Sequence, residues 1–220
     1  MSKSIKEIII ENKISGRGYD EFGRIRSFTE KEFFDVSCLM GLNQGNPEYR
    51  QLFEYLTDWV MSHLRIRTAI EIGAGPGYFL YCLNKRGIDC TGIDGNPHSK
   101  ELFDSLHPEF SSRYVLDKLF ENTYAPVDAL FSIETFEHIP DEGISNIMHK
   151  VTSELKPKII LFSSTPHADP NPGWDEQWGH INIKSSSEWH ELFSSYGYHL
   201  HQAKPPVTEW ASLYAHSSII

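Results

Sequence analysis

The pattern of hydrophobic and polar positions divides the chain near residue 65. Before that point the pattern is helical. Thr29, followed three positions later by Glu32, forms a capping box that marks the start of one helix. Pro47 favours the first turn of a second helix. Apolar residues then recur at helical spacing, at Leu52, Phe53, Leu56, Trp59 and Val60. The sequence therefore predicts a helical N-terminal cap over residues 1–64.

From Thr68 onward, short apolar runs alternate with helical segments. The runs have the length and composition of buried strands and lie at residues 68–73, 90–94, 127–133 and 158–164. The helical segments lie near residues 77–86, 97–106, 141–155 and 186–196. Strands that alternate with helices indicate a parallel sheet with helices on both faces. We therefore expect an α/β, doubly wound core over residues 65–220, folded as one compact unit.

Composition and charge narrow the class of protein. The chain has 220 residues, of which 40% are hydrophobic and 23% charged, as in an ordinary globular domain. Its formal net charge of -10 makes nucleic acid an unlikely partner, because proteins that bind the phosphate backbone usually carry a basic excess. The three cysteines lack a C-x-x-C spacing, and no apolar run is long enough to span a membrane. We therefore expect a cytoplasmic protein without a membrane span.

The first predicted strand ends in a glycine-rich turn, EIGAGPG. Gly73, Gly75 and Gly77 allow a ligand to approach the backbone, and the helix that follows offers its N-terminal amides. Asp94 ends the next strand 21 positions after Gly73, a spacing that suits contact with ribose hydroxyls. Tyr78 stands where the dinucleotide fingerprint requires a small residue. An adenosine ligand without a pyrophosphate is therefore favoured over NAD.

These motifs resemble those of the class I S-adenosylmethionine-dependent methyltransferases. EIGAGPG is similar to their first motif, GID to their second-strand acid, VLDKLFE to the segment beside the adenine and FSIETFEHI to the end of their fourth strand. The resemblance implies a mostly parallel, seven-stranded Rossmann-like sheet and S-adenosylmethionine as cofactor. It also implies a set of cofactor-binding residues, namely Glu71, Gly73, Ala74, Gly75, Gly77, Asp94, Gly95, Asp117, Lys118 and Glu134.

The segment FSIETFEHI carries Glu134, Glu137 and His138 in the pattern E-x-x-E-H. In a helical turn these three positions would share one face. The pattern resembles that of ubiquinone-biosynthesis O-methyltransferases and small-RNA terminal 2′-O-methyltransferases, which bind a divalent metal there with a second, later histidine. His180, in WGHIN, is placed to be that histidine. Oxygen and nitrogen ligands without a thiolate favour magnesium, manganese or iron. The predicted metal ligands are therefore Glu134, Glu137, His138 and His180.

The predicted reaction is methyl transfer to a hydroxyl group, with Glu137, His138 and His180 as catalytic residues. Two other interpretations of these residues stay open. His138 or His180 would serve as an acid or base without a metal, or the motif would be structural. A metal-independent N- or O-methyltransferase of a small molecule, and a cofactor-binding but inactive partner subunit, are the alternative functions.

The loop from residue 167 to residue 183 is rich in Pro, Gly and Trp and is long enough to act as a lid. Trp174 and Trp178 suit stacking on a sugar, or else they fasten the loop to the body of the protein. Polar side chains that suit hydrogen bonds to hydroxyls are Asp169, Asn171, Asp175 and Asn182. We therefore predict that the acceptor is a sugar, a glycan or another small polar metabolite. The sequence leaves the oligomeric state open.

Overall fold

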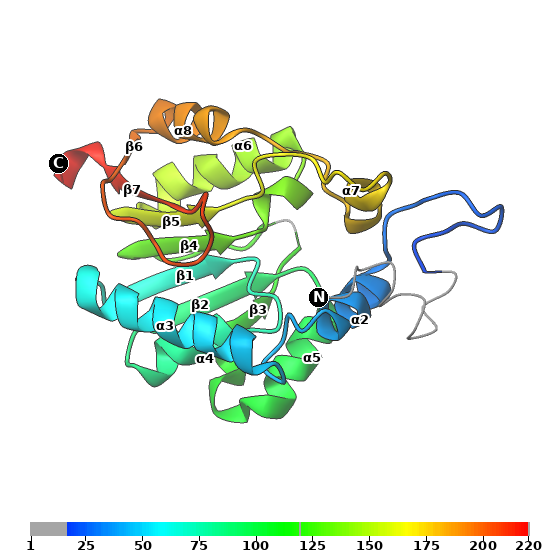
Figure 1. The fold of residues 1–220 in the computed structure, drawn as a ribbon. Helices are drawn as coiled ribbons and strands as arrows, with labels where there is room; N and C mark the ends of the chain where they lie inside the picture. Colours follow the sequence, from blue (N-terminus) through cyan, green and yellow to red (C-terminus); the bar gives the residue numbers. More distant parts are fainter. Residues whose placement is uncertain (1–16, 119, 220) are drawn as a thin grey trace.

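The computed structural model describes residues 17–118 and 120–219 (Figure 1), so the first 16 residues of the predicted cap lie outside the described part of the chain. Within that part, no helix has both the length and the apolar character that crossing a membrane requires. The three cysteines are free thiols, of which Cys82 and Cys90 are buried and Cys38 is partly buried. The cytoplasmic location stays a prediction.

Two helices occupy the described part of the predicted cap. Helix α2 (Glu30–Leu39) begins at the expected capping box, in which Thr29 Oγ1 accepts the N–H of Glu32 and the Glu32 carboxylate accepts the N–H of Thr29. Helix α3 (Pro47–His63) begins at its proline, as predicted. Both helix starts are therefore confirmed.

A seven-stranded sheet forms the centre of the molecule (Figure 1). In chain order its strands are β1 (Thr68–Ile72), β2 (Asp89–Asp94), β3 (Tyr114–Leu116), β4 (Ala129–Ile133), β5 (Ile159–Ser163), β6 (Tyr198–Leu200) and β7 (Ser212–His216). Their order across the sheet is β3-β2-β1-β4-β5-β7-β6. Neighbouring strands run parallel except at β7, which is antiparallel to both β5 and β6. The predicted doubly wound, mostly parallel sheet is therefore confirmed.

Helices cover both faces of this sheet (Figure 1). Helices α3, α4 (Tyr78–Lys85) and α5 (Pro97–Leu106) lie on one face. Helices α6 (Asp141–Lys150) and α8 (Ser186–Ser195) lie on the other, and α6 continues as a π-helical turn over Val151–Leu155. The four helices predicted after residue 68 are present to within one residue at each end.

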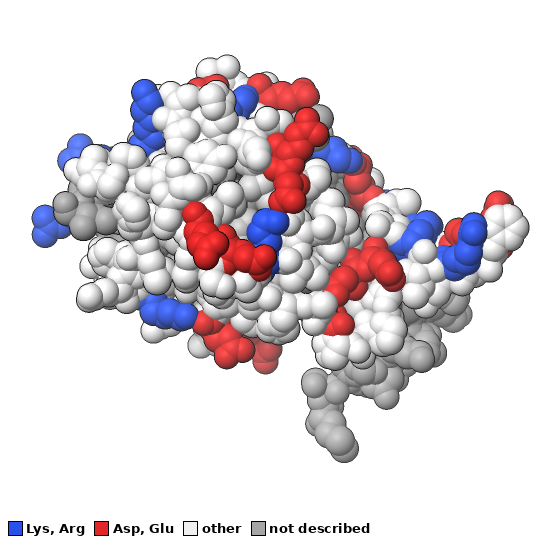
Figure 2. Space-filling view, turned by 90° about the horizontal axis from the view of Figure 1, so that it is seen from above, with Lys and Arg blue, Asp and Glu red and all other residues white. Residues whose placement is uncertain are grey.

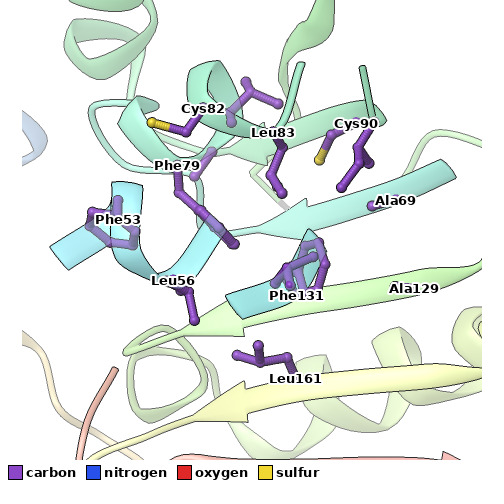
Figure 3. Close-up of a cluster of buried hydrophobic side chains, with 14 of the residues drawn as sticks. Phe53, Leu56, Ala69, Phe79, Cys82, Leu83, Cys90, Ala129, Phe131 and Leu161 are labelled. Atoms are coloured by element: carbon purple, nitrogen blue, oxygen red, sulfur yellow. The ribbon is translucent and has the colours of Figure 1, made fainter. Parts of the chain in front are cut away.

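The alternation of side chains along each strand divides the core into two clusters. Ala69 and Phe131 lie in the cluster beneath α3 and α4, whereas Ile70 and Leu130 lie in the cluster beneath α6 and α8. Figure 3 shows the first cluster, in which Phe53 of α3 lies near Phe79. Helix α3 therefore packs on the sheet in the same layer as α4.

Helix α2 and the short helix α7 (Trp174–Trp178) lie together beyond the carboxyl ends of the strands (Figure 1). The N–H of Phe28 donates to the carbonyl oxygen of Gln177 at 2.8 Å. The rings of Phe33 and Trp178 meet edge to face, with centroids 5.0 Å apart. These contacts join the N-terminal segment to the loop between β5 and α8, and together they cover the edge of the sheet where ligands bind in folds of this type.

Candidate active site

A cavity of about 410 Å³ lies at the carboxyl ends of β1 and β4, under α2 and α7. A cavity of this size is in the range of small-molecule sites. Five of the predicted cofactor-binding residues line it, namely Glu71, Gly73, Ala74, Gly75 and Glu134. All four predicted metal ligands line it, because Glu134 belongs to both sets and Glu137, His138 and His180 line it as well. One space therefore joins the glycine-rich turn to the E-x-x-E-H turn.

The three positions of the turn require glycine for different structural reasons. All have positive φ, at +78° for Gly73, +52° for Gly75 and +77° for Gly77. A Cβ atom at Gly73 would lie 2.0 Å from Thr135 Oγ1, and one at Gly77 would lie 2.3 Å from the Phe103 ring. A Cβ atom at Gly75 would meet no protein atom within 4 Å. Gly73 and Gly77 are therefore required by packing, whereas Gly75 leaves room in the cavity.

Glu71 places an uncompensated carboxyl group in the wall of this cavity. Its side chain is buried, and in the described part of the chain its Oε2 atom has no hydrogen-bond partner. Burial raises the pKa of Glu71 well above its usual value, and the charge of Asp94 raises it further. A cationic ligand would favour the ionised carboxylate. The amino acid part of S-adenosylmethionine, with its ammonium and sulfonium groups, fits this requirement.

Asp94 holds the glycine-rich turn in place. Its carboxylate oxygens accept the N–H of Gly75 at 2.8 Å and the N–H of Asn96 at 2.7 Å. Burial raises the pKa of Asp94, and these N–H donors oppose the rise. Asp94, Gly77 and Gly95 lie outside the lining of the cavity. The contact of Asp94 with ribose hydroxyls stays a prediction.

The two residues predicted beside the adenine are engaged within the protein. The Asp117 carboxylate accepts the N–H groups of Glu121 and Asn122 and the hydroxyl of Tyr124, at 2.8 to 2.9 Å. Lys118 Nζ donates to Glu30 of α2 at 2.5 Å. Neither residue lines the cavity. Their contact with adenine stays a prediction. Asp117 bonds to the segment that follows it, and Lys118 bonds to α2.

The E-x-x-E-H turn brings three of the four predicted metal ligands together. One potential ligand atom each from Glu137, His138 and His180 lies within 4.8 Å of the others. The carbonyl oxygen of Glu137 accepts the N–H groups of Ile181 and Asn182, at 2.9 and 3.0 Å, and these bonds fix the segment of His180 beside the turn. One carboxylate and two imidazoles form a donor set that fits a divalent transition metal ion.

Glu134, the first residue of the motif, has other partners. Its φ of +49° is left-handed, so the motif departs from a continuous helical turn before the 3-10 turn Phe136–His138 begins. Its carboxylate accepts hydrogen bonds from Ser163 Oγ, from Thr165 Oγ1 at 2.7 Å and from Trp210 Nε1 at 2.9 Å. Glu134 therefore lies outside the three-residue group, and its role as a fourth ligand stays a prediction.

The electrostatics of the group also fit a cation. Burial, and after it the charge of Glu134, raise the pKa of Glu137 to about 8. Burial, and after it the charge of His180, lower the pKa of His138 to about 4. His138 is therefore a neutral imidazole near pH 7, the form that binds metals. A divalent cation beside Glu137 would favour its ionised form and remove the cost of its burial.

A family model described as a methyltransferase domain matches residues 45–203. The chain belongs to this methyltransferase family. The resemblance to class I S-adenosylmethionine-dependent methyltransferases is thereby confirmed. An uncharacterized methyltransferase of Mycobacterium sp. (strain KMS) is 30% identical over 89 residues, which are 39% of this chain and 34% of that relative. The chain thus spans about a third of the length of the curated relatives it matches.

Solved methyltransferase structures share the fold at low sequence identity. A candidate O-methyltransferase from Nostoc punctiforme PCC 73102 superposes with a TM-score of 0.62 at 14% identity, over 97% of this chain and 67% of that chain. The methyltransferase domain of the bacterial protein CtHen1-C gives a TM-score of 0.55 at 18% identity, over 76% of this chain and 97% of that chain. These similarities establish the fold of the methyltransferase core.

The loop after β5 makes more contacts within the protein than we expected from the sequence. Trp178 is buried against Phe33, which fastens the loop, but Trp178 and Trp174 also line the cavity, so their stacking on an acceptor stays a prediction. Asn182 Nδ2 donates to the carbonyl oxygen of Ile139 at 2.9 Å, and Asp169 accepts the N–H of Asn171 at 2.7 Å. Side chains that we expected to contact a sugar therefore bond within the protein.

No pattern in the sequence indicated the partner of His180. Asp175 was expected to contact acceptor hydroxyls, but its Oδ1 atom lies 2.8 Å from His180 Nδ1. The two residues are five positions apart, and they meet because α7 ends at Gly179, whose φ is +73°. The pair is identified by the folded turn, because a spacing of five residues does not by itself bring two side chains together.

Proposed function

We propose that this protein transfers the methyl group of S-adenosylmethionine to a hydroxyl group of a small molecule. The observation that carries the proposal is the single cavity that Gly75 and Glu71 line on one side and Glu137, His138 and His180 on the other. A methyl donor on the glycine-rich turn and an acceptor at the three-residue group would therefore share one enclosed space. Holding two reactants in line in such a space lowers the entropy cost of their reaction.

The glycine-rich turn would bind the cofactor. Gly75 leaves room for it, and Glu71 offers a carboxylate oxygen that lacks a protein partner in the described residues. When bound, S-adenosylmethionine supplies an activated methyl group on its sulfonium. The role of the chain is to hold that methyl group toward the acceptor hydroxyl and to exclude water, which the cover of α2 and α7 supports.

Glu137, His138 and His180 would hold a divalent metal ion. When bound, such an ion lowers the pKa of a neighbouring hydroxyl group and orients it. Two imidazole nitrogens beside one carboxylate favour manganese or iron over magnesium, which prefers oxygen ligands. Ser164 Oγ donates to one carboxylate oxygen of Glu137 at 2.9 Å, and this hydrogen bond leaves the other oxygen for the cation. Without a metal, His138 or His180 would act as the general base.

The acceptor that the cavity supports best is an uncharged hydroxyl compound with an apolar body. Apolar side chains form most of the cavity lining, among them Phe33, Met40, Leu42, Leu52, Phe53 and Val207. A sugar, a glycan or another small polar metabolite is the acceptor that the sequence predicted. That prediction loses part of its support because Asn182 and Asp169 bond within the protein.

An RNA end is a weaker candidate, although a domain named CtHen1-C shares the fold. The chain has a formal net charge of -10. On the face shown in Figure 2, Lys and Arg side chains form separate small areas between Asp and Glu side chains. RNA binding draws much of its affinity from a continuous basic surface that neutralises phosphates.

A methyl-transfer screen with labelled S-adenosylmethionine tests the proposal. Phenols and other apolar hydroxyl compounds, saccharides and short RNAs are offered as acceptors, with manganese, iron or magnesium and with a chelator. We expect transfer to the apolar hydroxyl compounds, its loss in chelator and its return with manganese or iron. Full activity in excess chelator would contradict the metal and leave the general-base alternative. Absence of S-adenosylhomocysteine binding would contradict the methyltransferase function itself.

A further inference from the structure

The residue that holds His180 is Asp175, on the short helix α7. His180 Nδ1 lies 2.8 Å from Asp175 Oδ1. The backbone N–H of His180 also donates to the carbonyl oxygen of Asp175, at 2.8 Å. Between them, Gly179 takes a left-handed conformation that glycine adopts without strain, and the chain folds back there. One residue therefore fixes both the backbone and the ring of His180.

The carboxylate of Asp175 is itself fixed. Its second oxygen, Oδ2, accepts the backbone N–H of Asp169 at 2.9 Å. The side chains of Asp175 and His180 are 22% and 15% exposed, so water competes only weakly for the bond between them. A hydrogen bond between a carboxylate and an imidazole is stronger in such a shielded place than in open water. The ring of His180 is therefore held in one orientation.

We propose that Asp175 is a positioning residue that fixes the tautomer and the ring orientation of His180 for a divalent cation held with Glu137 and His138. This inference rests on the metal-assisted function proposed above. An imidazole that donates its Nδ1–H to a carboxylate keeps the lone pair on Nε2 for a metal. The ring of His180 lies beside that of His138, with centroids 4.8 Å apart. Asp175 is absent from the residues that line the cavity, so it acts through His180 and does not touch the acceptor.

A different role for Asp175 would be to stabilise the first turn of α7 through its negative charge. A substitution at Glu176 distinguishes these two roles of Asp175. It is the next residue in the same turn, it carries the same charge and it is exposed. Glu176→Gln therefore removes a charge from the same turn while it leaves the bond between Asp175 and His180 intact.

Metal affinity is the first measurement. Manganese is titrated calorimetrically into the full chain in the presence of S-adenosylhomocysteine. We expect Asp175→Ala to weaken manganese binding by about 10- to 100-fold, as for other partners of metal-binding histidines. Glu176→Gln should leave it unchanged, and both variants should bind S-adenosylhomocysteine as the parent protein does. Equal manganese affinities of Asp175→Ala and Glu176→Gln would overturn the inference.

The tautomer of His180 is the second measurement, and it needs no metal. Nitrogen-15 NMR of the metal-free protein distinguishes Nδ1–H from Nε2–H imidazole, and His180→Gln identifies the signal. We expect the Nδ1–H form in the parent protein and its loss in Asp175→Ala. An Nε2–H form in the parent, or no change in the variant, would overturn the inference. If the parent binds no divalent ion, the metal-assisted function fails, and the tautomer alone decides whether Asp175 positions His180.

Discussion

A side chain at Gly75 would enter the cavity, because a Cβ atom there meets no protein atom within 4 Å. The backbone of Gly75 is left-handed, with φ of +52°, and asparagine is the residue after glycine that best tolerates this conformation. Gly75→Asn should therefore lower the free energy of unfolding by only about 1 kcal/mol. Its amide group would occupy space that the cofactor needs.

The expected loss of cofactor binding follows from that overlap. Forcing extra heavy atoms into a filled site costs about 1–3 kcal/mol, which corresponds to about 5- to 150-fold weaker binding of S-adenosylhomocysteine. Calorimetric titration measures this affinity, and urea unfolding measures the stability of the same sample.

Gly87 provides the matched control. It also has a left-handed backbone, with φ of +86°, and a Cβ atom there also meets no atom within 4 Å. It lies in the exposed turn between α4 and β2, outside the lining of the cavity. Gly87→Asn should lose similar stability and keep full cofactor affinity. If Gly75→Asn binds S-adenosylhomocysteine as tightly as Gly87→Asn does, the cofactor does not occupy the space beside Gly75.

Two predictions concern the stability of the fold. Asp128 accepts hydrogen bonds from Lys158 and from the N–H of Arg67, and these bonds lower its pKa to about 2. Since an unfolded aspartate has a pKa of about 3.9, the stabilisation is complete above that pH and is lost as the pH falls toward about 2. Asp128→Asn should therefore lower the free energy of unfolding by about 1–2 kcal/mol near pH 7 and by almost nothing near pH 2, as measured by urea unfolding. Equal losses of stability at the two pH values would contradict this prediction. Thr29→Ala removes the N-cap of α2 and should lower the free energy of unfolding by about 1 kcal/mol, whereas Thr29→Ser keeps a hydroxyl and should retain most of that stability. Equal losses in the two variants would contradict the capping role of Thr29.

The elements that the sequence predicted well are those whose signals are local. The capping box at Thr29, the proline at Pro47 and the alternating runs around Ile70 each act within a few residues, and the structure has the helices and strands they indicate. Strands β3 and β6 are three residues long, so they carry too little pattern to be recognised. Their existence followed only from the resemblance to a known fold.

The candidate site was predictable only in part, because its geometry depends on contacts between distant segments. Glu137 and His180 meet through backbone hydrogen bonds between the E-x-x-E-H turn and the segment after α7, and nothing in either segment alone specifies them. The left-handed backbone of Glu134 is likewise set by its surroundings, where Ser163 and Trp210 hold its carboxylate. A motif in the sequence thus names candidate ligands, but the fold decides which of them converge.

The two buried acids of the cavity support its assignment as a functional site. Glu71 and Glu137 are almost completely buried, and burial is the largest cause of the raised pKa of each. Burying an acid without a cation beside it is costly, so apolar side chains at both positions would serve the stability of the fold better. A cationic cofactor beside Glu71 and a metal ion beside Glu137 would each remove that cost. Both acids line the same cavity, one at each of its functional ends, and this placement is expected if the fold retains them for ligands.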